Sequence, residues 1–284
     1  MYYSPLRYPG GKGKLAGLIY SVFERNELVG GHYVEPYAGG ASVALALLFN
    51  GYASRIIIND YDRSIYAFWH CVLNKTEELC QLISETEISP GEWYQQRGVQ
   101  ERKETAGLLE LGFSTFFLNR TSRSGIILKA GMIGGKKQDG EYKIDARFNK
   151  EDLIDRIRQI AKYKRFISVY NQDAIVLINE ISATLPAKTL IYFDPPYYVK
   201  AHKLYVNHYA HRDHVLVSRM INGIARHRWL VSYDNVQEIK KLYKNQKKFT
   251  YSLNYSAVNS TTGSEVIIYQ QDLIIPKAAR PKAA

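Results

Sequence analysis

Short apolar runs that alternate with helical stretches set the pattern of this chain. One run, residues 55–59, has Ile56, Ile57 and Ile58 at its centre and stops at Asp60. Runs of this length without polar alternation are typical of strands buried on both faces of a sheet. Helical stretches alternate with them, so the pattern predicts an α/β fold with a mainly parallel sheet. The further strands are expected at residues 166–170, 189–193 and 229–233, with helices over residues 41–49 and 65–83.

Three stretches depart from this pattern. Between residues 85 and 164, helices and Gly-rich basic loops replace the strand–helix alternation, which predicts an inserted subdomain. Residues 248–255 and 265–269 alternate apolar and polar positions around a turn-rich segment, which predicts a C-terminal hairpin. Residues 276–284 form a basic Ala/Pro tail that we expect to be disordered. We therefore divide the chain into a main domain, the insert and the tail, the main domain being residues 1–84 and 165–275.

Composition narrows the class of protein. The chain has 284 residues, of which 46% are hydrophobic, enough for one large domain that carries a subdomain. Its longest apolar stretch, residues 41–49, is too short to span a bilayer, and no charged-then-apolar leader follows Met1. Two cysteines, Cys71 and Cys80, are too few for a disulfide framework or a Cys-based zinc site, which fits a reducing cytoplasm. The formal net charge of +11 favours a phosphate-rich partner, although charge alone is weak evidence for one.

Polar residues at the carboxyl ends of parallel strands are the first candidates for a site. The sequence from Glu35 to Gly40 ends one strand in small residues, and Asp60 follows 25 residues after Glu35. This spacing suits a carboxylate that binds ribose hydroxyls. Because the turn lacks G-x-G-x-x-G, it favours a ribose ligand without pyrophosphate, such as S-adenosylmethionine, over a nicotinamide cofactor. For the turn and Asp60 alone, a plain βα turn with a surface Asp remains an alternative. A Walker phosphate loop over residues 10–14 is excluded, because Tyr8 and Leu15 stand where it needs Gly and Ser or Thr.

The tetrapeptide Asp194-Pro195-Pro196-Tyr197 ends another buried strand. Its two prolines stiffen the turn, so the Asp194 carboxylate and the Pro195 carbonyl become fixed acceptors. Two such acceptors match the two N–H donors of an exocyclic amine, and the ring of Tyr197 offers a face for a flipped base. The alternative is a rigid surface turn.

Five segments in this order resemble the Dam-like, D12-class N6-adenine DNA methyltransferases of the α group, over nearly the whole chain. The resemblance implies a Rossmann-like class I methyltransferase sheet of seven strands with an antiparallel C-terminal hairpin. It implies that S-adenosylmethionine is bound by Tyr8, Lys12, Glu35, Tyr37, Gly39, Asp60, Asp173 and Asp194. The catalytic motif is then Asp194 to Tyr197. The matching segments are residues 7–12, 35–40, 59–60, 171–173 and 194–197.

The activity that follows is methyl transfer from S-adenosylmethionine to the N6 amine of an adenine flipped out of double-stranded DNA. We expect no covalent intermediate and no metal. A bacterial or phage cytoplasm, a monomer or weak dimer, and a cognate restriction endonuclease as partner are consistent with such an enzyme.

The insert is expected to bind DNA. Residues 116–125 resemble the family's Leu-Asn-Arg…Gly recognition hairpin, and residues 116–150 hold eight Lys or Arg against three Asp or Glu. A solvated basic face is the alternative for each residue. GATC-specific members carry an Arg where Leu128 stands, which weakens the expectation of GATC specificity. The expected DNA contacts are Asn119, Arg120, Arg123, Ser124, Lys129, Lys136 and Lys137.

Three histidines, His208, His211 and His214, recur every three residues. Because no fourth ligand is identifiable, a helix start with Asp213 near its N-terminus is favoured over a metal site. Tyr209 or His208 could help to close over the flipped base.

Three other functions remain open from the sequence. The same chemistry could act on RNA adenine, cytosine N4 or a protein glutamine. A nicotinamide-dependent dehydrogenase would share the ribose-binding carboxylate. A catalytically silent DNA-binding module would explain the charge but not the motif at Asp194.

Overall fold

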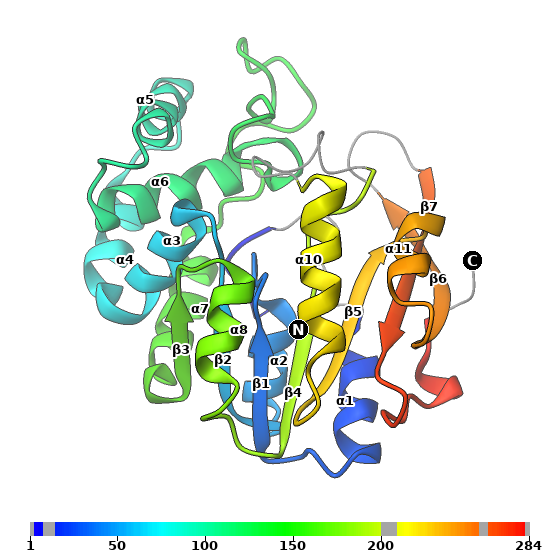
Figure 1. Ribbon diagram of the computed structural model, residues 1–284. Helices are drawn as coiled ribbons and strands as arrows, with labels where there is room; N and C mark the ends of the chain where they lie inside the picture. The colour runs from blue at the N-terminus through cyan, green and yellow to red at the C-terminus, as the bar shows by residue number, and fades with distance from the viewer. Residues whose placement is uncertain (1–2, 8–14, 200–208, 256–260, 282–284) are drawn as a thin grey trace.

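Seven strands form one sheet in the order β3-β2-β1-β4-β5-β7-β6 (Figure 1). The computed structural model describes residues 3–7, 15–199, 209–255 and 261–281. The neighbours from β3 to β5 pair in parallel, while β7 is antiparallel to both β5 and β6. This confirms the mainly parallel class I methyltransferase sheet with its antiparallel hairpin. The strands are β1 (Gly31–Glu35), β2 (Ala53–Asn59), β3 (Ile167–Tyr170), β4 (Thr189–Phe193), β5 (Arg228–Asp234), β6 (Lys247–Tyr255) and β7 (Thr261–Tyr269).

Apolar runs in the central strands supply both faces of the sheet. Within β2, Ile56 and Ile58 join one buried cluster and Ile57 joins the other, because successive side chains point to opposite faces. The first cluster contains the buried sides of α1 (Ala16–Arg25), α2 (Ser42–Phe49) and α3 (Arg63–Asn74). The second contains residues of α8 (Ala174–Ile181), α10 (His211–Asn222) and α11 (Gln237–Leu242), and α10 lies in front of the sheet in Figure 1. The sheet is therefore covered on both faces, as an α/β fold requires.

The insert packs on α3 and shares the first of these cores. Its helices α5 and α6 follow α4, and buried aromatic residues of α6, such as Phe116, stack on Phe68 of α3. The helix expected over residues 65–83 is two helices, because Lys75 leaves the helical conformation (φ −138°) between α3 and α4. The bounds are α4 (Thr76–Glu85), α5 (Pro90–Glu101), α6 (Leu108–Thr121), α7 (Lys150–Ala161) and the short turns η2 (Arg123–Gly125) and η3 (Lys164–Phe166).

The first part of the C-terminal tail, residues 276–281, contacts the outer strands, although its composition predicted disorder. A 3₁₀ turn, η4 (Lys277–Ala279), follows buried Ile275. The Arg280 guanidinium lies 4.6 Å from the centre of the Phe249 ring and donates to the Tyr269 hydroxyl. The tail binds the outer strands because a planar cation stacks well on an aromatic face. Residues 282–284 lie outside the described ranges.

No helix in the described ranges is both long and apolar enough to cross a membrane.

Candidate active site at the carboxyl ends of the strands

The strand order reverses between β1 and β4, and this position is where open α/β sheets bind ligands. Glu35 ends β1 and Asp194 directly follows β4, so both carboxylates lie at this point. Each is held by a tyrosine hydroxyl, directly or through one intermediate. The Tyr33 hydroxyl donates to Glu35 over 2.8 Å, and Tyr192 reaches Asp194 through Ser232.

The contact between Asp194 and Ser232 fixes the direction of a buried hydrogen-bond chain. The Ser232 hydroxyl lies 2.6 Å from Oδ1 of Asp194 and 2.8 Å from the hydroxyl of Tyr192. An ionised carboxylate only accepts, so Ser232 donates to Asp194 and Tyr192 donates to Ser232. The Asp194 carboxylate is therefore oriented by side chains that are themselves fixed in the sheet.

Tyr197 differs from its expected state. Its side chain is only 2% exposed, and its hydroxyl donates to Oε1 of the buried Glu265 over 2.5 Å. The ring is therefore buried, with its hydroxyl held by β7. Asp234 holds the next two residues, because its carboxylate accepts the backbone N–H groups of Tyr198 and Val199 at 2.8 and 2.9 Å.

The turn after β1 is bound to the end of β2. Gly39 adopts φ +47°, and its N–H donates to Oδ2 of Asp60 over 3.0 Å while its carbonyl accepts from the Trp69 indole. Burial, with Asp62 nearby, raises the pKa of Asp60 to about 7. The predicted pair of Gly turn and acidic residue is thus in direct contact.

Asn59, next to the expected ribose-binding residue Asp60, connects several loops of the site. Its side chain donates to the carbonyls of Pro36 and Gln172 at 2.9 and 3.0 Å, and its Oδ1 accepts from the Gln172 N–H. It thereby binds together the loops that follow β1, β2 and β3. Asp173, which follows Gln172, caps α8, because its Oδ1 accepts from the N–H groups of Ile175 and Val176.

The remaining expected cofactor residues fall into two groups. Glu35 and Tyr37 lie at the site: burial raises the pKa of Glu35 to about 8, and the Tyr37 hydroxyl lies 3.2 Å from that of Tyr209. The Tyr37–Tyr209 contact joins the turn after β1 to the segment before α10. Tyr209 in this segment is one of the two residues expected to help to close over the flipped base. Tyr8 and Lys12 lie outside the described residues.

The predicted recognition hairpin, residues 116–125, is helical as far as Thr121, within α6, and a small hairpin follows from Ser122 to Met132. Ser122 and Met132 form an antiparallel bridge, and the N–H of Arg123 donates to the carbonyl of Gly131. Ser124, in the short turn η2, is partly exposed. The expected DNA contacts that are exposed here are Arg123, Lys129, Lys136 and Lys137.

Two expected DNA contacts have structural partners instead. Asn119 is fully buried and bonds both backbone groups of Arg7 and the carbonyl of Gly125. The Arg120 guanidinium donates to the carbonyl of Pro5 over 2.7 Å, and burial lowers its pKa to about 9. Both were expected from the segment that resembles the family's Leu-Asn-Arg…Gly recognition hairpin, but they lie near the end of α6, where Asn119 bonds the backbone of Arg7 and Arg120 bonds that of Pro5.

The histidines form no metal site among the residues that the structure describes. His214 is fully buried, and its Nδ1 lies 3.2 Å from the hydroxyl of Tyr233. The helix start was predicted correctly, because the Asp213 carboxylate accepts from the N–H of Ala210 at the N-terminus of α10. His208 lies outside the described residues.

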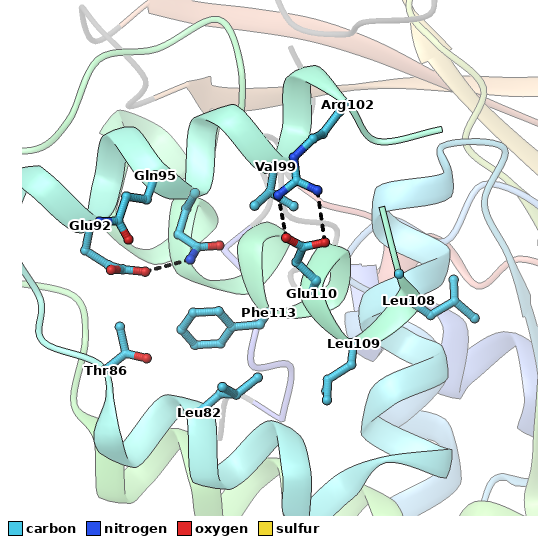
Figure 2. Close-up of a pocket in the computed structure, with 12 residues that line it drawn as sticks. Leu82, Thr86, Glu92, Gln95, Val99, Arg102, Leu108, Leu109, Glu110 and Phe113 are labelled. Atoms are coloured by element: carbon cyan, nitrogen blue, oxygen red, sulfur yellow. Dashed lines mark hydrogen bonds and ion pairs between the residues drawn. The ribbon is translucent and has the colours of Figure 1, made fainter. Parts of the chain in front are cut away.

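A cavity of about 730 Å³ lies within the helical region, away from the strand ends (Figure 2). Apolar side chains such as Leu82, Leu109 and Phe113 line it, and an ion pair between Arg102 and Glu110 lies at its side. None of the expected cofactor or catalytic residues lines this cavity.

Known proteins are similar to this chain in sequence and in structure. The chain is 23% identical over 207 residues to the Type II methyltransferase M.MjaIII of Methanocaldococcus jannaschii, an alignment covering 68% of each protein. Among solved structures, protein PH1948 from Pyrococcus horikoshii covers 95% of this chain and 88% of its own at 10% identity and a TM-score of 0.44. The rRNA methyltransferase aviRa from Streptomyces viridochromogenes covers 90% of this chain and 85% of its own, with 11% identity and a TM-score of 0.36. The model of the D12 class N6 adenine-specific DNA methyltransferases matches residues 8–257, so the chain belongs to this family of S-adenosylmethionine-dependent DNA methyltransferases.

Proposed function

We propose that the enzyme methylates an adenine flipped out of double-stranded DNA, with Asp194 and the Pro195 carbonyl as the acceptors for its N6 amine. The observation that carries this proposal is the place and orientation of Asp194. It follows β4 at the reversal of strand order, and Ser232 holds its carboxylate at 2.6 Å. Acceptors on both N–H groups draw electron density to nitrogen and help to pyramidalise it. The fixed carboxylate thus prepares the lone pair for attack.

The residues at the ends of β1 to β4 fit S-adenosylmethionine. Gly39 has a left-handed conformation in which a side chain would be strained, and the carboxylates of Asp60 and Asp173 offer acceptors for hydroxyl and amine groups. Glu35 and Tyr37 line the turn beside them. When bound, S-adenosylmethionine supplies an electrophilic methyl group. The enzyme's part is to position the amine in line with that group, which requires no Lewis acid.

The DNA side of the proposal rests on the hairpin that follows α6. Arg123 and Lys129 are exposed on it, Ser124 is partly exposed, and Lys136 and Lys137 are exposed shortly after it. We assign these side chains to phosphate and base contacts, since exposed cations neutralise backbone phosphates. Residues 85–164 then form the target-recognition subdomain of a catalytic domain made of residues 1–84 and 165–275.

The wider setting completes the proposal. An adenine methyltransferase of this kind can act beside a cognate restriction endonuclease in a bacterial or phage cytoplasm. We propose that it acts as a monomer or weak dimer, since its own chain supplies both the transfer site and the recognition hairpin.

The test is to incubate the purified protein with S-adenosylmethionine and unmethylated genomic DNA, digest the DNA to nucleosides and quantify N6-methyladenine by mass spectrometry. We expect the modified base with the wild type and none with Asp194→Ala. Formation of N4-methylcytosine, or methylation of added RNA but not of DNA, would refute the proposal. Sequencing the methylated DNA gives the recognition site.

A further inference from the structure

Three side chains of β5 and β7 contact the catalytic loop at successive points. Ser232 bonds the Asp194 carboxylate, Glu265 bonds the Tyr197 hydroxyl, and Asp234 bonds the two backbone N–H groups that follow. All three are buried, with exposed fractions of 0 to 5%. Residues 194–199 are therefore held along their length by the sheet.

The sheet geometry makes these three residues a single unit. Asp234 and Glu265 are directly opposite each other in the antiparallel pairing of β5 and β7. Ser232 lies two residues before Asp234 and so points to the same face. Neighbouring strands fix the spacing of the three side chains more firmly than a loop would.

Two buried carboxylates that lie opposite each other would repel unless each had its own donors. Asp234 receives two backbone N–H groups, and Glu265 receives the hydroxyls of Tyr197 and Tyr251. Three of these four donors belong to the catalytic loop, so docking of the loop satisfies both carboxylates. The same hydrogen bonds that stabilise the sheet end also set the positions of Asp194 and Tyr197.

We propose that Ser232, Asp234 and Glu265 are positioning residues for methyl transfer, acting through Asp194 and Tyr197. This inference rests on the proposed function, in which those two residues contact the target adenine. It gives the C-terminal hairpin a part in the reaction. Its strand β7 supplies the carboxylate that binds the Tyr197 hydroxyl and so restricts the orientation of the ring. Loss of a positioning contact should slow methyl transfer more than it weakens cofactor binding, because most of the expected cofactor residues, from Glu35 to Asp173, lie at or just after the ends of β1 to β3.

A mutant cycle tests the Glu265 contact. The variants are Tyr197→Phe, Glu265→Gln and their combination, with Tyr251→Phe as the matched control. Tyr251→Phe removes a hydroxyl from the same carboxylate, but from β6 and not from the catalytic loop. Each variant is assayed by single-turnover methylation of a duplex that carries the mapped site, by S-adenosylmethionine titration and by thermal unfolding.

We expect Tyr197→Phe and Glu265→Gln each to lower the rate constant by about tenfold or more, with the double variant no slower than the slower single one. Tyr251→Phe should stay within about twofold of the wild type, a loss too small to be a positioning effect. Wild-type rates in folded Tyr197→Phe or Glu265→Gln, or an equal loss in Tyr251→Phe, would overturn the assignment of Glu265.

Ser232→Ala gives a second test that does not depend on Glu265. Ser218→Ala is its control, because Ser218 is also buried and donates its hydroxyl to the Val215 carbonyl within α10. We expect the single-turnover rate to fall for Ser232→Ala alone, by a larger factor than the affinity for S-adenosylmethionine. Equal rates in the two variants would refute the positioning role of Ser232. If the wild type forms no N6-methyladenine, or Asp194→Ala retains activity, the proposed function itself fails.

Discussion

Asn119 binds Arg7 through both of its backbone groups: the Arg7 N–H donates to Oδ1 at 2.7 Å and Nδ2 donates to the Arg7 carbonyl at 2.6 Å. The same Nδ2 donates to the carbonyl of Gly125 in the recognition hairpin. A Cβ at Gly125 would lie 2.4 Å from the Arg7 carbonyl oxygen, so the two backbones are in close contact. One buried amide thus joins the N-terminal segment to the hairpin.

This contact predicts the effect of Asn119→Ala. It leaves several buried backbone groups without a partner, so we expect the free energy of unfolding to fall by about 1–3 kcal/mol. Urea denaturation measures this loss. Asn74→Ala, which removes an exposed amide from a helix end, should change stability by much less. A variant with unchanged stability but weaker DNA binding would show instead that Asn119 is a DNA contact.

Lys136 and Lys137 are expected to bind phosphates. In the double variant Lys136→Ala/Lys137→Ala, the DNA affinity should fall and the slope of log K against log salt should decrease by about 2. Fluorescence anisotropy over a range of salt concentrations measures both. Lys241→Ala/Lys244→Ala removes the same charge from exposed positions at the end of α11, so it separates a local contact from a general charge effect. Equal slopes in the two double variants would contradict the assignment of Lys136 and Lys137 as phosphate contacts.

Asp60 should make cofactor binding depend on pH. Its pKa is raised to about 7, so below that pH the unliganded enzyme holds the neutral acid, which binds ribose hydroxyls less well. We expect the affinity for S-adenosylmethionine to fall by up to about tenfold for each pH unit below 7. Calorimetric titrations between pH 5 and 8 measure this. Asp60→Asn should bind weakly with little pH dependence, whereas a wild type with a flat profile would argue against a role for the Asp60 carboxylate.

Glu35 should destabilise the folded enzyme at alkaline pH. Its pKa is about 8 when folded and near 4.5 when unfolded, so folding takes up a proton between these values. Stability from this group is fully present below pH 4.5 and is lost as the pH rises to about 8. Glu35→Gln should therefore gain stability over the wild type as pH rises, by at most roughly 1.4 kcal/mol for each pH unit.

Thermal unfolding between pH 5 and 9 measures that difference. The control is Glu24→Gln, since Glu24 also accepts from a tyrosine hydroxyl, that of Tyr52 at 2.9 Å, but at an exposed position. Its stability relative to the wild type should not change over this range. The same pH trend in both variants would mean that burial of Glu35 is not the cause.

The contacts of Arg280 in the tail lead us to expect different results for two truncations. A chain that ends at Ile275 loses the Arg280 contacts with Phe249 and Tyr269, so its stability should fall by about 1 kcal/mol. A chain that ends at Pro281 keeps them and should match the full chain. Thermal unfolding distinguishes the two, and equal melting temperatures would show that the tail contributes nothing.

The sequence alone predicted the features that depend on local pattern. Buried strands require continuous apolar runs, as in Ile56 to Ile58, and the polar residue that ends each run marks the carboxyl edge of the sheet. For this reason the mainly parallel sheet, the turn at Gly39 and the motif at Asp194 were all predicted from short segments. Nothing in the composition of the tail indicated that Arg280 would contact an aromatic ring on β6.

Only the tertiary structure decided which polar side chains face the site and which hold the fold. Asn119 and Arg120 were expected to contact DNA because they lie in the segment that resembles the recognition hairpin. They bond instead the backbone carbonyls of Arg7 and Pro5, more than 100 residues away. Ser232 and Glu265 carry no motif, and their closeness to Asp194 and Tyr197 arises from pairing between β4, β5 and β7. Hydrogen bonds between such distant segments depend on how the strands pair, and a single sequence holds no local pattern that specifies those contacts.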